Sequence, residues 1–122
     1  MDKEPAAKIY GVLGYPVQHS LSPAMHNAAF KALNINAEYR LFEIKPQELA
    51  AFLGALKQKN ISGLNVTIPY KEKVIPYLNH ISEDAKLIGA VNTIKVSGQG
   101  LEGFNTDGEG FLRLSILFRA LI

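Results

Sequence analysis

The sequence predicts an α/β fold: a three-layer open sheet, mainly parallel with one antiparallel strand, with helices on both faces. Two observations carry this prediction. Between residues 9 and 89, short apolar runs alternate with segments of helical periodicity, which is the pattern of parallel strands joined by helices. Two further strand-like runs then flank the sequence SGQG, which is typical of a hairpin and adds the antiparallel strand.

The first predicted elements are two strands with a helix between them. Residues 9–13 (IYGVL) form an apolar run of the length of a buried strand. Residues 37–44 alternate in polarity and form the second strand. Between them, Ser22 followed by Pro23 predicts a helix start, with the serine as N-cap. The expected apolar face of this helix consists of Met25, Ala28, Ala29, Ala32 and Leu33.

A second helix and a third strand follow. Pro46 opens the helix at its first turn. Its apolar stripe consists of Leu49, Phe52, Leu53 and Leu56. Residues 61–68 form the strand, which stops at Pro69. We expect a short helix after Pro69, ended or bent by Pro76.

The last part of the sequence predicts a capped helix, a hairpin and a final helix. Residues 82–89 begin with serine, carry acids in the first turn and end in glycine, as capped helices do. Residues 91–96 and 101–104 are the two strands of the hairpin. Thr106 and Glu109 have the spacing of a capping box, which predicts the final helix.

Length and composition indicate a single domain over residues 1–122. Of these residues, 48% are hydrophobic and 20% are charged, as in a folded soluble protein. The net charge is +2 and Lys and Arg form no cluster, which argues against a nucleic-acid partner. The chain has no cysteine, which rules out disulfides and leaves the compartment open. It also has no run near the ~20 apolar residues of a membrane span and no signal-peptide core. We therefore expect a cytoplasmic protein.

Two serines precede the first predicted helix. In open α/β sheets, ligands bind beyond the carboxyl ends of the strands, and this loop lies at such an end. Ser20 and Ser22 are two residues apart, so both hydroxyls are expected on one side of an extended loop. With the N–H groups and positive dipole end of a helix, they suit a carboxylate. Alternatively, Ser22 only caps the helix and Ser20 is an ordinary loop residue.

A second polar group ends the third predicted strand. Asn65 and Thr67 are two residues apart, so their side chains project from one face of the strand. Lys71 follows on the first turn after the strand. An amide, a hydroxyl and an ammonium that converge suit a ligand rich in hydroxyl or carbonyl oxygens. The alternative is a solvated lysine beside two turn-forming residues.

Asn92 and Asp107 complete the candidate site. Asn92 lies just inside a predicted strand, where its amide needs partners from the backbone or from a ligand. Asp107 lies in the first turn of the final helix, where the dipole favours a carboxylate, although capping alone also explains it. No metal site is expected, because the spacing of the three histidines matches no ligand motif. The sequence also lacks a dinucleotide fingerprint.

Four segments, GYPVQHSLSPAMHN, NVTIPYK, GAVNT and GFNTDGEG, together resemble the N-terminal, substrate-binding domain of shikimate dehydrogenase. That family comprises NADP-dependent enzymes of aromatic amino-acid biosynthesis. The resemblance implies that Ser20 and Ser22 hold the carboxylate of shikimate or 3-dehydroshikimate. It further implies that the ring hydroxyls are bound by Asn65, Thr67 and Asn92. Lys71 and Asp107 match the catalytic pair of the family, and Asp107 would also bind a ring hydroxyl.

The resemblance also implies that substrate and cofactor are bound by two different domains. The family continues into a Rossmann domain that binds NADP, which this sequence does not include, so we expect no cofactor binding and no appreciable turnover by this chain alone. We also expect self-association through an apolar C-terminal stretch. Its residues are Leu112, Leu114, Ile116, Leu117, Phe118, Leu121 and Ile122. The alternative function is a non-catalytic binding module for shikimate- or quinate-like carboxylates.

Overall fold

A computed structural model of the chain describes residues 7–18 and 20–106. Three of the sequence-based predictions fall outside these ranges: the final helix begun by Thr106 and Glu109, the role of Asp107, and the apolar C-terminal stretch.

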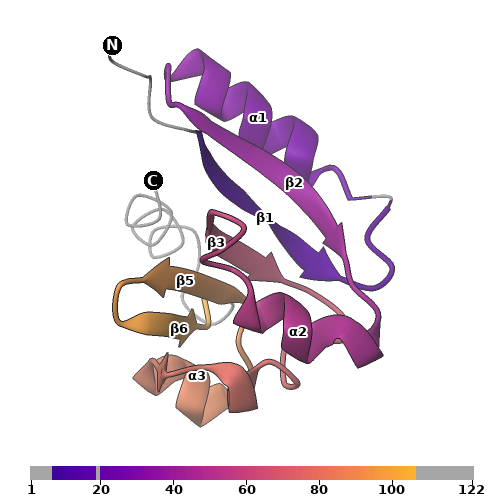
Figure 1. The fold of residues 1–122 in the computed structure, drawn as a ribbon, viewed down its shortest axis with the longest axis vertical. Coiled ribbons are helices and arrows are strands. Elements are labelled where there is room, and N and C mark those ends of the chain that lie inside the picture. The colour runs from indigo at the N-terminus through magenta and orange to yellow at the C-terminus, as the bar shows by residue number, and fades with distance from the viewer. Residues whose placement is uncertain (1–6, 19, 107–122) are drawn as a thin grey trace.

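In the described part of the chain, six strands form one sheet in the order β2-β1-β3-β5-β6-β4 (Figure 1). The strands are β1 (Lys8–Gly14), β2 (Ala37–Glu43), β3 (Ile61–Val66), β4 (His80–Ile81), β5 (Thr93–Ser97) and β6 (Gly100–Phe104). Strand β1 pairs in parallel with β2 and β3, and β4 pairs in parallel with β6. Only β5 runs the other way, antiparallel to both β3 and β6. The prediction of a mainly parallel sheet with one antiparallel strand is therefore confirmed.

Helices cover both faces of this sheet. Helix α1 (Ser22–Ala32) packs through Phe30 onto Tyr10 and Val12 of β1 and Tyr39 of β2. Side chains alternate along a strand, so Leu13 of β1 points to the other face. There it joins a larger core with residues of α2 (Leu49–Gly54) and α3 (Glu83–Ile88). This larger core consists of Leu13, Leu49, Phe52, Leu53, Leu56, Ile61, Leu64, Val66, Tyr70, Val74, Ala85, Val91, Ile94 and Leu101.

Two helix predictions are confirmed in detail. The whole predicted stripe of the second helix is buried, although the segment is divided into a 3₁₀ turn, Pro46–Glu48, and α2, and Leu56 lies in the turn that follows α2. Helix α3 begins after Ser82, whose Oγ accepts a hydrogen bond of 3.2 Å from the N–H of Ala85. It ends at Gly89 with φ of +78°, a conformation that glycine adopts without strain.

The predicted apolar face of α1 is wrong. Phe30 is the buried residue of this helix, whereas Met25 and Leu33 are 68% and 67% exposed. The physical reason lies at the free edge of β2, where the side chain of Asn27 bonds the backbone of Tyr39. These bonds turn the side of α1 that carries Phe30 and Asn27 toward the sheet.

The predicted helix after Pro69 is also wrong. The structure has turns at residues 71–74 and then a short 3₁₀ helix, Ile75–Tyr77. Two prolines a few residues apart each remove a backbone donor, which leaves too short a segment for α-helical hydrogen bonding. Strand β4 was not predicted, because two residues carry no periodic pattern. Strand β3 ends at Val66, two residues before its predicted end.

Candidate functional site

The direction of the strands brings the candidate residues to one edge of the sheet. The carboxyl ends of β1, β2 and β3 meet there, because these strands are parallel. Strand β5 is reversed, so its amino end, next to Asn92, lies at the same edge. Strand β6 is antiparallel to β5 and returns the chain there at Thr106.

The loop after β1, which leads to the two serines, is held by Glu43 at the end of β2. The Oε2 atom of Glu43 accepts a hydrogen bond of 3.2 Å from the N–H of Val17. Its Oε1 atom accepts one of 3.1 Å from Nε2 of Gln18. Sequence reasoning assigned no role to Glu43, and its position at a strand end was the only available signal.

The two serines lie together at the start of α1. The N–H of Ser22 donates to Oγ of Ser20 at 3.2 Å. The expectation that Ser22 is the N-cap is wrong, because α1 already includes Ser22 and its N-cap is Leu21, with no side-chain cap. The Ser20 hydroxyl instead accepts the hydrogen bond from the Ser22 N–H. The Ser22 hydroxyl makes no hydrogen bond to any residue that the structure describes.

Asn65 and Thr67 line the same cavity as the two serines. Its volume is about 400 Å³. It is lined by Val12, Pro16, Val17, Gln18, Ser20, Ser22, Asn65, Val66 and Thr67. The structure thus brings together four of the predicted residues, three hydroxyls and one amide over an apolar floor. The backbone of Thr67 is fixed in turn, since its N–H donates to the carbonyl of Leu13 at 2.9 Å.

Gly14 allows this cavity to form. A Cβ atom at this position would lie 2.4 Å from Cγ1 of Val17 and 2.5 Å from Cγ2 of Thr67. Both distances are far below a van der Waals contact, and both neighbours line the cavity. Only glycine lets the serine loop and the end of β3 approach each other this closely.

Lys71 lies in the turn that follows β3, but it does not line this cavity. It borders a separate hollow of about 210 Å³ with Ile68, Pro69, Glu72 and Lys73. Its backbone is anchored to the segment before β5, because its carbonyl accepts a hydrogen bond of 2.7 Å from the N–H of Val91.

Asn92 precedes β5 and has partners within the protein. Its Nδ2 donates to Oγ1 of Thr106 at 2.9 Å, and its Oδ1 accepts from the N–H of Thr106 at 3.1 Å. The same oxygen accepts from Oγ1 of Thr93 at 3.0 Å. Asn92 therefore fixes the residue that directly precedes Asp107.

A buried tyrosine, which sequence reasoning did not include in the site, contacts Asn65. The hydroxyl of Tyr39 in β2 donates to Oδ1 of Asn65 at 2.6 Å. Burial raises the pKa of Tyr39, so the phenol stays protonated at neutral pH and can donate. Nothing in the sequence pattern distinguishes Tyr39 from an ordinary core residue of its strand.

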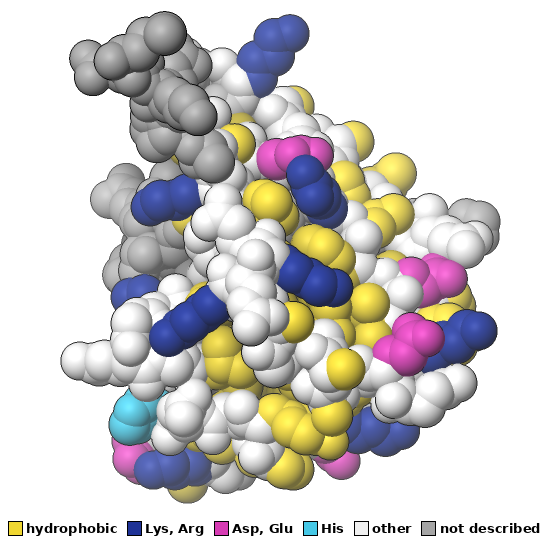
Figure 2. Space-filling model, viewed as in Figure 1, with side chains coloured by type: hydrophobic (Ala, Val, Ile, Leu, Met, Phe, Trp, Pro, Cys, Tyr) yellow, Lys and Arg dark blue, Asp and Glu magenta, His cyan; other side chains and the backbone are white. Residues whose placement is uncertain are grey.

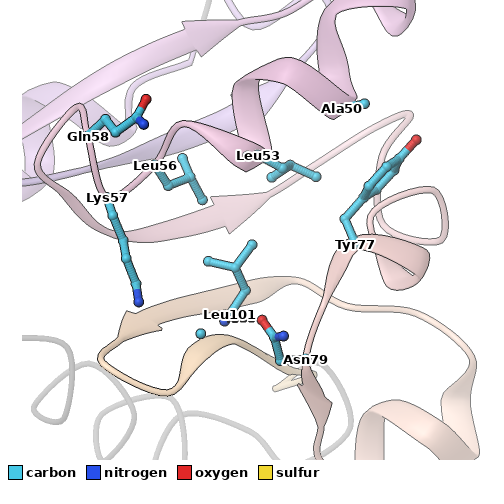
Figure 3. Close-up of a pocket in the computed structure, with 10 residues that line it drawn as sticks. Ala50, Leu53, Leu56, Lys57, Gln58, Tyr77, Asn79 and Leu101 are labelled. Carbon is cyan, nitrogen blue, oxygen red and sulfur yellow. Dashed lines mark hydrogen bonds between the residues drawn. The ribbon is translucent and has the colours of Figure 1, made fainter.

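A second cavity, of about 580 Å³, lies between α2 and the β5–β6 hairpin (Figure 3). Figure 3 shows Leu53, Leu56 and Leu101 around it. Asn79 also lines this cavity, and its Oδ1 already accepts a hydrogen bond of 2.8 Å from the N–H of Leu101. This cavity includes no residue of the candidate site.

Other classes of site find little support in residues 7–18 and 20–106. No three His, Asp or Glu side chains gather there as metal ligands would. No helix in these ranges is long and apolar enough to cross a membrane. Figure 2 shows the described Lys and Arg side chains scattered among apolar and acidic ones on the face in view.

The chain is similar to known proteins over most of its length. Residues 12–94 match the family described as shikimate dehydrogenase substrate binding domain. The chain is 53% identical over 105 residues to the shikimate dehydrogenase (NADP(+)) of Methanopyrus kandleri, covering 86% of this chain and 36% of that protein. It also matches the structure of shikimate 5-dehydrogenase from Thermus thermophilus in complex with shikimate, with a TM-score of 0.80 and 38% identity. That match covers 90% of this chain and 42% of the other.

A third match names a different substrate. The ligand-free 5-ketofructose reductase of Gluconobacter sp. has a TM-score of 0.82 and 32% identity, covering 91% of this chain and 40% of that one. The chain spans between a third and two fifths of the length of the curated relatives named as shikimate dehydrogenases. The family match covers more than half of the chain, and the resemblance inferred from four short segments is confirmed. The chain belongs to the family of shikimate dehydrogenase substrate-binding domains.

Proposed function

We propose that this chain is the substrate-binding and catalytic half of an NADP-dependent shikimate dehydrogenase, which interconverts 3-dehydroshikimate and shikimate. One observation carries the proposal: Ser20, Ser22, Asn65 and Thr67 line a single cavity at the edge where the parallel strands end. The names of the relatives support this choice of substrate.

In this proposal the serine end of the cavity binds the carboxylate of the substrate. The hydroxyls of Ser20 and Ser22 supply donors next to the first turn of α1, whose dipole favours a negative charge. The Ser22 hydroxyl is well suited, because it bonds no other described residue.

The other end of the cavity binds the hydroxyls of the ring. Asn65 offers an amide and Thr67 a hydroxyl, and Val12, which pairs with Asn65 in the sheet, adds apolar surface to the same cavity. Asn92 supports the site mainly through its bonds to Thr106. Direct contact of Asn92 with a ring hydroxyl, which the resemblance implies, stays a prediction.

Lys71 and Asp107 supply the acid–base chemistry. Reduction of the ketone adds a hydride to carbon and a proton to oxygen. Lys71 donates that proton or stabilises the alkoxide, and Asp107 orients the ammonium group. The described residues do not fit a dinucleotide, because β1 leads into a loop bound to Glu43 and not into a glycine-rich turn that opens a helix. In this proposal the hydride donor is held by residues other than the described ones.

A shikimate titration of the isotope-labelled chain, followed by NMR, tests the proposal. We expect saturable shifts at Ser20, Ser22, Asn65 and Thr67, and weaker binding by Ser22→Ala. Ser62→Ala is the matched control, because Ser62 lies in β3 but outside the cavity. A folded spectrum that does not respond to shikimate would contradict the proposal.

One observation favours a second candidate, a binding module for shikimate- or quinate-like carboxylates without chemistry. Lys71 borders a different hollow from the one that gathers the hydroxyl and amide groups. Adding a separately expressed NADP-binding domain of a relative distinguishes the two. Restored NADPH oxidation supports the enzyme, and ligand binding without it supports the module.

A further inference from the structure

Tyr39 lies in the middle of β2, outside the cavity. Its side chain is 4% exposed and packs with Tyr10, Val12 and Phe30 under α1. Its hydroxyl reaches across the sheet to Oδ1 of Asn65 at 2.6 Å, a short and well-formed hydrogen bond. Asn65 itself lines the cavity. The bond therefore connects the small core under α1 to the wall of the candidate site.

Helix α1 contacts both the backbone and the ring of Tyr39. Strand β2 is an edge strand, and the side chain of Asn27 takes the place of a neighbouring strand. Its Oδ1 accepts from the N–H of Tyr39 at 2.8 Å, and its Nδ2 donates to the carbonyl of Tyr39 at 3.0 Å. The ring of His26 stacks on the ring of Tyr39, with centroids 4.2 Å apart and planes at 17°. Backbone and ring of Tyr39 are thus both fixed.

Tyr10 shows that the bond to Asn65 is not a general result of burial. It is 5% exposed and belongs to the same apolar cluster. Its hydroxyl has no hydrogen-bond partner among the residues that the structure describes. Of these two tyrosines, which have similar surroundings, only Tyr39 bonds a residue that lines the cavity.

We propose that Tyr39 is a positioning residue that sets the orientation of the Asn65 amide and so selects the ligand group bound there. A carboxamide presents an acceptor on one side and a donor on the other. When the Tyr39 hydroxyl donates to Oδ1, the Nδ2 group of Asn65 is left to face the cavity. The ligand must then offer an oxygen acceptor at this point, such as a ring hydroxyl. The ligand named in this inference rests on the function proposed above.

The matched pair of variants is Tyr39→Phe and Tyr10→Phe. Each removes one hydroxyl from the same cluster and keeps the ring. We expect Tyr39→Phe to weaken shikimate binding by about three- to tenfold, the range for losing one hydrogen bond that orients a binding group. Tyr10→Phe should leave the affinity unchanged. In an Asn65→Ala background, Tyr39→Phe should have no further effect, which a merely structural role of Tyr39 would not produce.

A measurement without ligand separates this inference from the proposed function. The side-chain amide signals of Asn65 should shift in Tyr39→Phe and stay in place in Tyr10→Phe. If shikimate does not bind the unmodified chain, the proposed function fails, and the amide signals still decide the role of Tyr39. Unchanged amide signals in Tyr39→Phe, or unchanged shikimate affinity in that variant, would overturn the inference while the proposed function stands.

Discussion

Glu43 ends β2 and accepts a hydrogen bond of 3.2 Å from the N–H of Val17, which ties the edge strand to the loop that leads to the serines. The second carboxylate oxygen binds Gln18, so one side chain fixes two consecutive residues. The serines line the cavity, whereas Glu43 does not. Glu43 therefore affects the site through the loop.

Glu43→Ala should mobilise this loop and weaken shikimate binding. The loss of the two hydrogen bonds is expected to lower the free energy of unfolding by about 1–3 kcal/mol. Amide hydrogen exchange at Val17 and Gln18 should become faster, as measured by NMR. Glu43→Gln is the control, because its amide oxygen still accepts one of the bonds, and it should show a smaller change in both exchange and affinity.

Gly14→Ala should damage both stability and binding. The added methyl group would overlap Val17 and Thr67, and relief of such an overlap typically costs about 1–3 kcal/mol. Urea unfolding and the shikimate titration measure the two effects. Gly54→Ala at the end of α2 is the matched control, because its added methyl group would meet no atom within 4 Å beyond its chain neighbours and the backbone of its own helix. Equal behaviour of the two variants would contradict the packing described around Gly14.

His26 should make stability depend on pH. Burial lowers the pKa of His26 below its ordinary value of about 6.5, so the unfolded chain binds this proton more readily than the folded one. Stability is then full above about pH 6.5 and declines as the pH falls through the lower pKa of the folded state. His26→Phe keeps an aromatic ring against Tyr39 but cannot titrate. Urea unfolding across this range should show that the stability difference between the two proteins changes with pH.

Asn92→Ala tests whether that residue supports the site mainly through Thr106. Loss of its bonds to Thr106 and Thr93 should reduce the free energy of unfolding by about 1–3 kcal/mol. Thr106→Val removes one end of the same network, so the effects of the two variants should be less than additive. Fully additive losses, measured by thermal unfolding, would show that the two side chains act separately.

Much of the fold could be predicted because local pattern and final packing agree. The stripe of α2 is buried as its spacing predicts, and Ser82 and Gly89 mark the ends of α3. The buried face of α1 could not be predicted this way. The position of that helix depends on Asn27 reaching the free edge of β2, a contact between residues 12 positions apart.

The candidate site was predictable to a similar degree. Two serines before a helix and two polar residues at a strand end could be found by spacing alone, and they share one cavity. The residues that position these side chains could not be found from the sequence. Tyr39 and Asn65 are separated by 26 positions, as are Val17 and Glu43, and neither pair has a local pattern. Such contacts can be identified only from a structure in which the strands lie side by side.

The reversed direction of β5 also has a practical consequence. The β5–β6 hairpin starts and ends at the binding edge, so its turn, with the exposed residues Gly98 and Gln99, lies at the opposite end of the strands. A fluorophore or a surface tether attached at Gln99 would therefore leave the cavity open to solution. An immobilised biosensor built on this domain would present the edge that carries the candidate site outward by virtue of the topology alone.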